Sequence, residues 1–470
     1  MLPFAANRRQ ALGAAACGFG QLALHGLLPA SAGASAPIQT PHFAPRAKRV
    51  IFLFMQGGPS QVDSFDYKPL LEKRHGTNLA FDDARTIAKT GKRGSSQLFK
   101  KSLWKFRQYG ESGRWVSDLF PEIGSHADQL CMLHSLHTEG IAHGPATLFL
   151  HCGATNLVRP SMGSWVHYGL GSENDNLPGF VSICPSPGNG GARNYDNAFL
   201  PPMYRGTTLG SAGRPAADAR IKNLVNKRYQ PEQQQQQYAL LQSLNAAQLA
   251  RHSADATLES VIGSFELAWR MQRDAPSVLD LDRETEATLR LYGINQKETN
   301  DFGRECLLAR RMCEAGVRYI QVTYGDSGAN PAWDQHSNLP KHADHARRVD
   351  RPIAGLLTDL KQRGLLEDTL VWWGAEFGRT PYAQDRGTGR DHNPNGFTVW
   401  LAGGGVKPGI AFGATDEFGH MAVQDKIHMH DLHATILHLM GIDHQRLTYR
   451  YSGRDFRLTD VHGRVVQEIF

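Results

Sequence analysis

The sequence predicts an α/β fold in which a mostly parallel central sheet is flanked by helices and carries a helical insertion. Short apolar runs rich in β-branched and aromatic residues alternate with amphipathic helical patterns, which is typical of parallel sheets. The runs are nearly continuous in apolar character, as expected for strands buried on both faces. They cover residues 46–58, 129–136, 179–184, 317–324, 369–373 and 397–402.

The first segment of the chain, residues 1–36, has the layout of a twin-arginine export signal. Arg8 and Arg9 precede a mildly apolar stretch, and small residues lead up to Ala36. A membrane anchor is the alternative, but the apolar stretch is shorter than the ~20 residues that a spanning helix needs. We therefore expect export by the twin-arginine route to the periplasm or the extracellular space, with no membrane span in the mature chain.

Charge and cysteine content exclude three classes of protein. The net charge of +6 over 470 residues is too dilute to indicate a nucleic-acid partner. The six cysteines include no Cys-x-x-Cys pattern, and this sparse set predicts neither a disulfide framework nor a zinc ribbon. We expect one large domain over residues 45–470.

Helical patterns complete the predicted fold. Residues 346–363 place apolar side chains on one face of a helix, and residues 205–298 are predicted as the helical insertion. The histidine-rich residues 428–441 suggest a metal site by count alone. We interpret them instead as a core helix, because apolar residues recur at helical spacing and Asp431 sits where a capping residue would.

The turn after the first strand is the first candidate site. Gly57 and Gly58 would let backbone amides approach a ligand, and Ser60 or Asp63 could contact an anion or a metal. A strand-to-helix turn with Ser or Asp as the cap explains the same residues equally well.

The second candidate site begins at His143. Pro145 suits the first turn of a helix, so His143 or Gly144 would lie at the helix N-terminus, where amides favour an oxyanion. A capped helix with a satisfied histidine is the alternative, and the residues alone do not decide between the two.

The third candidate site is a metal centre at predicted strand ends. Carboxylate oxygens and imidazole nitrogens suit a divalent metal such as zinc or manganese, and a guanidinium there could hold an anionic group. His342 and His345, one helical turn further on, are expected to be solvated. The predicted ligands are Asp334, His336, Glu376, Asp391 and His392, with Arg379 beside them. Asp391 would be either a ligand itself or the residue that orients His392.

Several motifs resemble a known group, the secreted "domain of unknown function 1501" family. The resemblance covers nearly all of residues 45–470 and implies the fold of alkaline phosphatases and sulfatases. The motifs are Gly57-Gly58-Pro59-Ser60-Gln61-Val62-Asp63, Arg159-Pro160-Ser161-Met162-Gly163-Ser164-Trp165, Trp333-Asp334-Gln335-His336, Gly374-Ala375-Glu376-Phe377-Gly378-Arg379-Thr380-Pro381, Gly389-Arg390-Asp391-His392 and Ala434-Thr435-Ile436-Leu437.

The resemblance also implies roles for individual residues. In the wider superfamily, two metals hold a nucleophile and a phosphate or sulfate ester. Glu376 takes the place of the Asp in an Asp-His pair, Phe377 replaces the His of that pair, and Gly144 falls where a nucleophilic Ser or Thr would be expected. The chain also lacks the Cys/Ser-x-Pro-x-Arg signature of sulfatases.

These departures shape the predicted function. We expect a metal-dependent hydrolase of phosphate or sulfate esters that acts through metal-bound water, because no side-chain nucleophile is evident. His143 would lie near the developing oxyanion, and Ser60, Gly144 and Arg379 would contact an anionic ester substrate. The alternative is a catalytically degenerate member of the fold that acts as a binding protein.

Overall fold

The structure, a computed structural model, describes residues 40–80, 96–221, 224, 228–251, 256–328, 330–383 and 388–470. The expected export signal at residues 1–36 lies outside these ranges. The chain divides into two units, and the described part of the smaller one is Thr448–Phe456, a hairpin of β18 (Tyr449–Tyr451) and β19 (Arg454–Phe456). The larger unit, Pro37–Leu447 with Arg457–Phe470, contains all elements discussed below.

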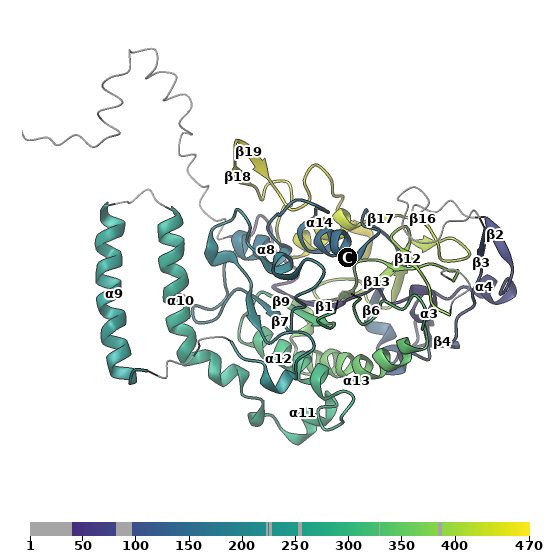
Figure 1. Ribbon diagram of the computed structural model, residues 1–470, viewed down its shortest axis with the longest axis horizontal. Coiled ribbons are helices and arrows are strands. Elements are labelled where there is room, and N and C mark those ends of the chain that lie inside the picture. The colour runs from purple at the N-terminus through teal and green to yellow at the C-terminus, as the bar shows by residue number, and fades with distance from the viewer. Residues whose placement is uncertain are drawn as a thin grey trace, which may run out of the picture. The chain divides into compact units, whose positions relative to one another are not determined.

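A nine-stranded sheet forms the centre of the larger unit (Figure 1), in the order β14-β6-β13-β10-β1-β9-β7-β8 with β17 also paired to β6. Neighbouring strands are parallel except at β13, which runs antiparallel to both β10 and β6. The strands are β1 (Arg49–Met55), β6 (Leu130–His137), β7 (Phe180–Ile183), β8 (Thr207–Leu209), β9 (Tyr319–Tyr324), β10 (Thr369–Gly374), β13 (Phe397–Ala402), β14 (Ile410–Phe412) and β17 (Ile427–His428).

All six predicted runs form strands of this sheet, which confirms the mixed α/β class with a mostly parallel sheet. Strand β1 is central, pairing Ile51 with Val371 on one side and with Ile320 on the other. Because successive side chains alternate between faces, β1 contributes to two cores. Phe52 stacks on Trp372 at 3.7 Å on one face, whereas Ile51 joins the core that includes the helices after residue 300.

Helices cover both faces of the sheet. Figure 1 shows α12 and α13 on one side, and α8 and α14 on the other. The longer helices outside the insertion are α7 (His143–Cys152), α8 (Met162–Leu170), α12 (Asn300–Glu314), α13 (Lys341–Gln362) and α14 (Met429–Leu439), and the short ones are α3 (Gln61–Ser64), α4 (Pro69–Lys73) and α6 (Pro121–Gly124). Short paired strands complete this part: β2 (Asn78–Ala80) with β3 (Ser96–Leu98), β4 (Phe106–Tyr109) with β5 (Arg114–Ser117), β11 (Gly378–Arg379) with β12 (His392–Asn393), and β15 (Ala414–Thr415) with β16 (Ala422–Gln424).

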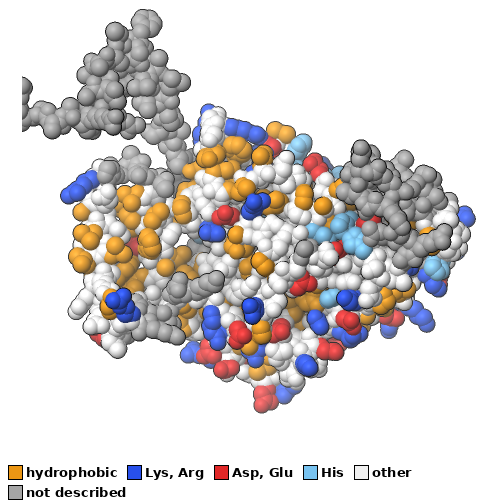
Figure 2. Space-filling view, in the orientation of Figure 1, with side chains coloured by type: hydrophobic (Ala, Val, Ile, Leu, Met, Phe, Trp, Pro, Cys, Tyr) orange, Lys and Arg blue, Asp and Glu red, His pale blue; other side chains and the backbone are white. Residues whose placement is uncertain are grey.

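Within the described residues of the predicted insertion, 205–298, there are three α-helices and one strand of the sheet. The strand is β8, at the sheet edge, and the helices are α9 (Pro231–Arg251), α10 (Ala256–Leu279) and α11 (Glu286–Leu291). Helices α9 and α10 carry large apolar side chains that face solvent, among them Leu240, Leu244 and Phe265, each more than half exposed. Figure 2 shows apolar side chains spread over this part of the surface.

The histidine-rich helix α14 is a packed core element. Its N-cap is His428, and Asp431 is the third residue of a capping box rather than the cap itself, accepting a 3.0 Å hydrogen bond from the His428 amide. Leu432, Ile436 and Leu439 are buried. No helix in the described part of the chain combines the length and apolar character of a membrane span. The five cysteines there are buried and free.

Candidate metal centre

Three adjacent parallel strands, β10, β1 and β9, end at one edge of the sheet, where ligands bind in folds of this kind. Gly57 follows β1, the loop with Asp334 follows β9, and Glu376 follows β10. Gly57 has φ +110°, and a Cβ there would lie 2.8 Å from the Asp334 amide nitrogen. Only glycine therefore allows the Asp334 loop to approach β1 so closely.

Asp334 is the centre of the site. Its buried Oδ1 atom lies 3.2 Å from His143 Nε2, 2.8 Å from His336 Nε2 and 3.2 Å from His392 Nε2. Arg379 Nη2 donates to the same oxygen at 2.8 Å. These hydrogen-bonding groups hold the pKa of Asp334 well below its ordinary value, against the effect of burial. Asp334 is therefore a carboxylate at neutral pH.

The other ring nitrogens of two histidines fix their orientation. His392 Nδ1 lies 2.8 Å from the Ile141 carbonyl oxygen, which can only accept, so Nδ1 carries the proton. His143 Nδ1 lies 2.7 Å from Glu376 Oε1 and donates to it in the same way. In the neutral His392 ring, Nε2 then directs a lone pair toward the Asp334 carboxylate. The raised pKa of His143 favours a proton on its Nε2 instead. A lone pair that faces an anionic oxygen at 3.2 Å is an arrangement that a bound cation would stabilise.

Two overlapping groups of side chains in the described residues have the spacing of a metal site. The first is His143, Asp334 and His392, and the second is His336, Asp391 and His392. Asp391 Oδ1 lies 3.4 Å from His336 Nδ1. Short strands β11 and β12 pair Arg379 with His392, which brings the Asp391-His392 pair beside Arg379. The donor atoms, carboxylate oxygen and imidazole nitrogen, fit a divalent metal.

The pKa values of two of the histidines shift in opposite directions. Burial lowers the pKa of His392 to about 3, so its ring is neutral, the form that binds a metal. Burial also lowers the pKa of His143, but the nearby carboxylates of Asp334 and Glu376 outweigh it and hold that pKa above the ordinary value.

Glu376 lies behind His143 and belongs to neither group of metal-binding geometry. It is fully buried, and Glu376 Oε1 and Oε2 accept the Gly57 amide at 3.0 and 3.2 Å. Its contact with His143 Nδ1 fixes the orientation of that ring, as outer carboxylates do for metal-binding histidines. The predicted role of Glu376 as a direct ligand stays a prediction.

Arg379 is fully buried beneath the centre. Its guanidinium donates to the carbonyl oxygens of Gly57, Gly58 and Trp333 as well as to Asp334. Contact of Arg379 with an anionic group stays a prediction, but here its donors are directed at Asp334 and the backbone.

Ser60 is turned into the interior. Its hydroxyl donates to Asp63 Oδ2 at 2.5 Å, and its amide donates to His342 Nε2 at 3.2 Å. Asp63 forms a two-pronged ion pair with Arg390, at 2.6 and 3.3 Å. The expectation that His342 and His345 are solvated is wrong: His342 is buried, and His345 is half-buried with Nδ1 2.8 Å from the Tyr324 hydroxyl.

Helix α7 begins at His143, as predicted, with Ala142 as the N-cap. Gly144 has no atom within 4 Å of the position where a Cβ would lie, so open space adjoins the first turn. His143 Nε2 is buried and lacks a partner with hydrogen-bond geometry among the described residues. The helix N-terminus and this nitrogen together suit an anion.

The sequence interpretation missed Arg390 and the Ile141 carbonyl. Arg390 directly precedes Asp391 in the sequence, but nothing in the local pattern connects it with Asp63, which lies 327 residues earlier. Backbone carbonyls leave no signal in the sequence at all.

Several solved structures resemble this chain, whereas comparison with curated proteins found no match. The lipoteichoic acid synthase LtaP from Listeria monocytogenes has a TM-score of 0.38 and 9% identity, covering 91% of this chain and 78% of that one. The phosphonate monoester hydrolase SpPMH from Silicibacter pomeroyi has a TM-score of 0.38 and 12% identity, covering 89% and 76%. A TAB5 alkaline phosphatase mutant with Mg bound has a TM-score of 0.36 and 12% identity, covering 84% and 98%. The family model described as "Protein of unknown function (DUF1501)" matches residues 47–470, which confirms the resemblance in the motifs: the chain belongs to this family.

Proposed function

We propose that the protein is a metal-dependent hydrolase of phosphate or sulfate esters, with water as the nucleophile. The observation that carries the proposal is the convergence of His336 and His392 on one oxygen of Asp334, with Asp391 Oδ1 3.4 Å from His336 Nδ1. A divalent ion held by these side chains would supply Lewis acidity and lower the pKa of a water molecule. Zinc and manganese both suit the donor set.

The chain's own residues orient the reacting groups. The N-terminus of α7 and the open space at Gly144 would receive the anionic ester, where helix amides favour negative charge. His143, oriented by Glu376, lies at that position to stabilise charge developing on an oxygen. Arg379 holds Asp334 in place from below. No side-chain hydroxyl occurs at positions 143–146, so a covalent intermediate on this turn is not expected.

Metal content is the first test. Protein purified without chelators should contain a transition metal or bind added zinc or manganese, and His392→Ala should lose it. His444→Ala, which removes a buried histidine that contacts Thr459, is the matched control and should retain the metal. Less than about a tenth of an equivalent, unchanged by added metal, would refute the metal site.

Turnover is the second test, with phosphate monoesters, phosphate diesters and sulfate esters as substrates. His392→Ala should abolish activity, and His143→Ala should lower it by about 10²–10³ if it acts on the oxyanion. Thr147→Ala removes the nearest hydroxyl on α7, a buried group without a hydrogen-bond partner in the described structure, and should leave most activity. A phosphorylated enzyme trapped on Thr147 or Ser161 would refute water attack. Metal binding without turnover of any ester would favour a binding protein.

We also propose that the protein is exported by the twin-arginine route, because Arg8 and Arg9 precede a mildly apolar stretch. A reporter fused to residues 1–40 should reach the periplasm, and the same fusion with both arginines replaced by lysine should stay in the cytoplasm. A cytoplasmic location of the unmodified fusion would contradict the proposal.

A further inference from the structure

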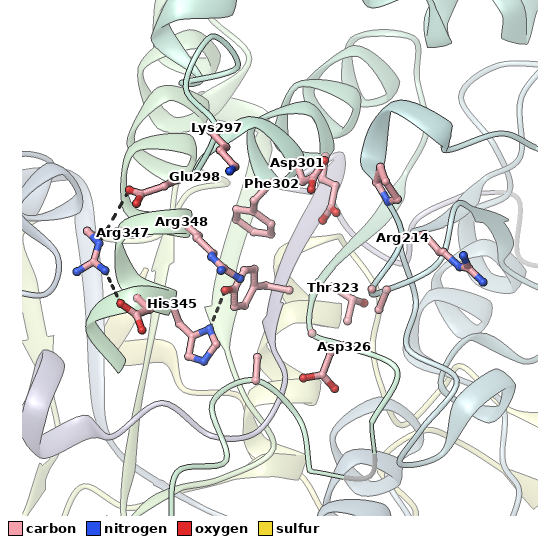
Figure 3. Close-up of a pocket in the computed structure, with 18 residues that line it drawn as sticks. Arg214, Lys297, Glu298, Asp301, Phe302, Thr323, Asp326, His345, Arg347 and Arg348 are labelled. Atoms are coloured by element: carbon pink, nitrogen blue, oxygen red, sulfur yellow. Dashed lines mark hydrogen bonds and ion pairs between the residues drawn. The ribbon is translucent and has the colours of Figure 1, made fainter. Parts of the chain in front are cut away.

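A cavity of about 680 Å³ lies apart from the metal ligands, at the end of β9 between α12 and α13 (Figure 3). Its volume is in the range of small-molecule sites, about 300–1,000 Å³. It shares the loop after β9 with the metal centre, since Ala332 lines the cavity and Asp334 is a predicted ligand. None of its lining residues belongs to the metal centre.

The interior of the cavity contains a carboxyl group that interacts with the Cys184 thiol but keeps one oxygen unpaired. Glu305, on α12, is buried, and its Oε2 atom has no hydrogen-bond partner in the described structure. Burial raises the pKa of Glu305 to about 8, so near pH 7 the group is mostly protonated and can both donate and accept a hydrogen bond. An unpaired buried polar group of this kind destabilises the folded protein. A ligand hydroxyl would satisfy it.

Two positively charged residues that line the cavity have no acidic partner in the described part of the chain. Lys297 and Arg348 are exposed and form no ion pair with any described residue, although Arg348 also contacts the Tyr324 hydroxyl. Figure 3 shows both side chains on the same side of the cavity.

The acidic residues of the lining, by contrast, do not pair with Lys297 or Arg348, and other groups hold their carboxylates in place. Asp301 accepts the Ala216 amide at 3.1 Å, Asp326 accepts the Gly328 amide at 2.9 Å, and Arg347 pairs with Asp344 and lies 4.0 Å from Glu298. Lys297 and Arg348 therefore remain available to an anionic group of a ligand, to which Arg348 can donate two parallel hydrogen bonds.

We propose that this cavity binds a small anionic, polyhydroxylated molecule such as a sugar acid or a sugar phosphate. The hydroxyl groups lie toward Glu305 and the buried Thr323, and the acidic group lies at Lys297 and Arg348. Phe302 and Tyr324, whose rings meet edge to face at 5.3 Å, form an apolar wall for the carbon skeleton. This site is independent of the proposed hydrolysis and stands whether or not the metal centre is active.

Calorimetric titration of the full chain tests the proposal, with glucuronate, neutral glucose and inorganic phosphate as probes. Glucuronate should bind saturably, and glucose and phosphate at least about tenfold more weakly, because each offers only half of the recognised groups. Glucose 6-phosphate is titrated into His392→Ala, so that turnover cannot interfere, and should bind if the acidic group is a phosphate. Arg348→Gln should weaken glucuronate binding at least about tenfold, whereas Arg283→Gln, an exposed arginine outside the cavity, should not.

Glu305→Met separates binding from a structural role. Methionine is similar in size and removes the unsatisfied polar atom, so the variant should be more stable to urea and yet bind glucuronate more weakly. Lower stability together with unchanged binding would overturn the role of Glu305. Failure of both glucuronate and glucose 6-phosphate to bind, or equal effects of Arg348→Gln and Arg283→Gln, would overturn the proposal. The proposal would also be overturned if phosphate bound as tightly as the sugar ligands and if His392→Ala abolished that binding. Phosphate would then lie at the metal centre.

Discussion

A single carboxylate oxygen, Asp334 Oδ1, determines much of the chemistry at the residue scale. Three imidazoles and one guanidinium surround it, and the orientation of two of the rings is set by the Ile141 carbonyl and by Glu376. The sequence supplied the residue types, but the structure separated their roles. Glu376 orients His143, and Arg379 supports Asp334 from a buried position.

Gly144→Ala tests the open space at the start of α7. Gly144 has a negative φ, and an added Cβ meets no atom within 4 Å, so the substitution should raise stability by about 0.4–1 kcal/mol. The same methyl group would occupy the space proposed for the ester, so kcat/KM should fall. Gly263→Ala in α10 also adds a Cβ into open space and is the control: it should raise stability without changing turnover. Equal turnover of the two variants would contradict the placement of the ester.

Glu305 should make stability depend on pH. Its pKa is about 8 in the folded protein and near 4.5 when unfolded, so between these values the folded state holds a proton that the unfolded state releases. The free energy of unfolding should therefore fall as pH rises through this window, by up to about 1.4 kcal/mol for each unit of raised pKa. Urea denaturation at several pH values should show a smaller fall for Glu305→Gln than for the native chain. Parallel pH profiles would contradict the assignment.

At the scale of elements, α14 shows what local pattern can and cannot predict. The apolar spacing correctly identified a core helix, but the histidine at the N-cap was not anticipated, and Asp431 proved to be the third helical residue. Boundaries were less well predicted elsewhere too, since α13 starts at Lys341 rather than at 346, and β8 lies within the predicted insertion. Element ends depend on contacts with other segments, which periodicity does not contain.

Asp431→Ala should destabilise the protein by about 1–2 kcal/mol through loss of the α14 capping box. The carboxylate accepts the His428 amide at 3.0 Å and the Arg464 amide at 2.7 Å, and alanine leaves both without this partner. Asp431→Asn keeps one acceptor oxygen and should lose less. Urea denaturation provides the measurement, and a loss below a few tenths of a kcal/mol for Asp431→Ala would show that these amides find other partners.

At the scale of the whole molecule, the metal centre joins segments that are far apart in the sequence. His143 and Glu376 are separated by 233 residues, and Asp334 and His392 by 58. An ion bound only by the folded state stabilises it by mass action, by about 2.7 kcal/mol when the free ion is at a hundred times its Kd. Chelator treatment should therefore lower Tm in the native chain and leave Tm of His392→Ala unchanged. An equal shift in both would place the stabilising ion elsewhere.

The sequence by itself determined the α/β class, the strands β1, β6, β7, β9, β10 and β13, and the residue types at the strand ends, because these depend on local periodicity and composition. Only the tertiary structure decided which nitrogen faces which oxygen, that His342 is buried, and that Ser60 and Arg390 meet in one network around Asp63. It also decided that α12, α13 and β9 enclose the cavity at Glu305. These features come from strand order and helix packing, which bring residues distant in the sequence together. The spacing of residues along the chain does not determine such distances, because they depend on how the sheet assembles.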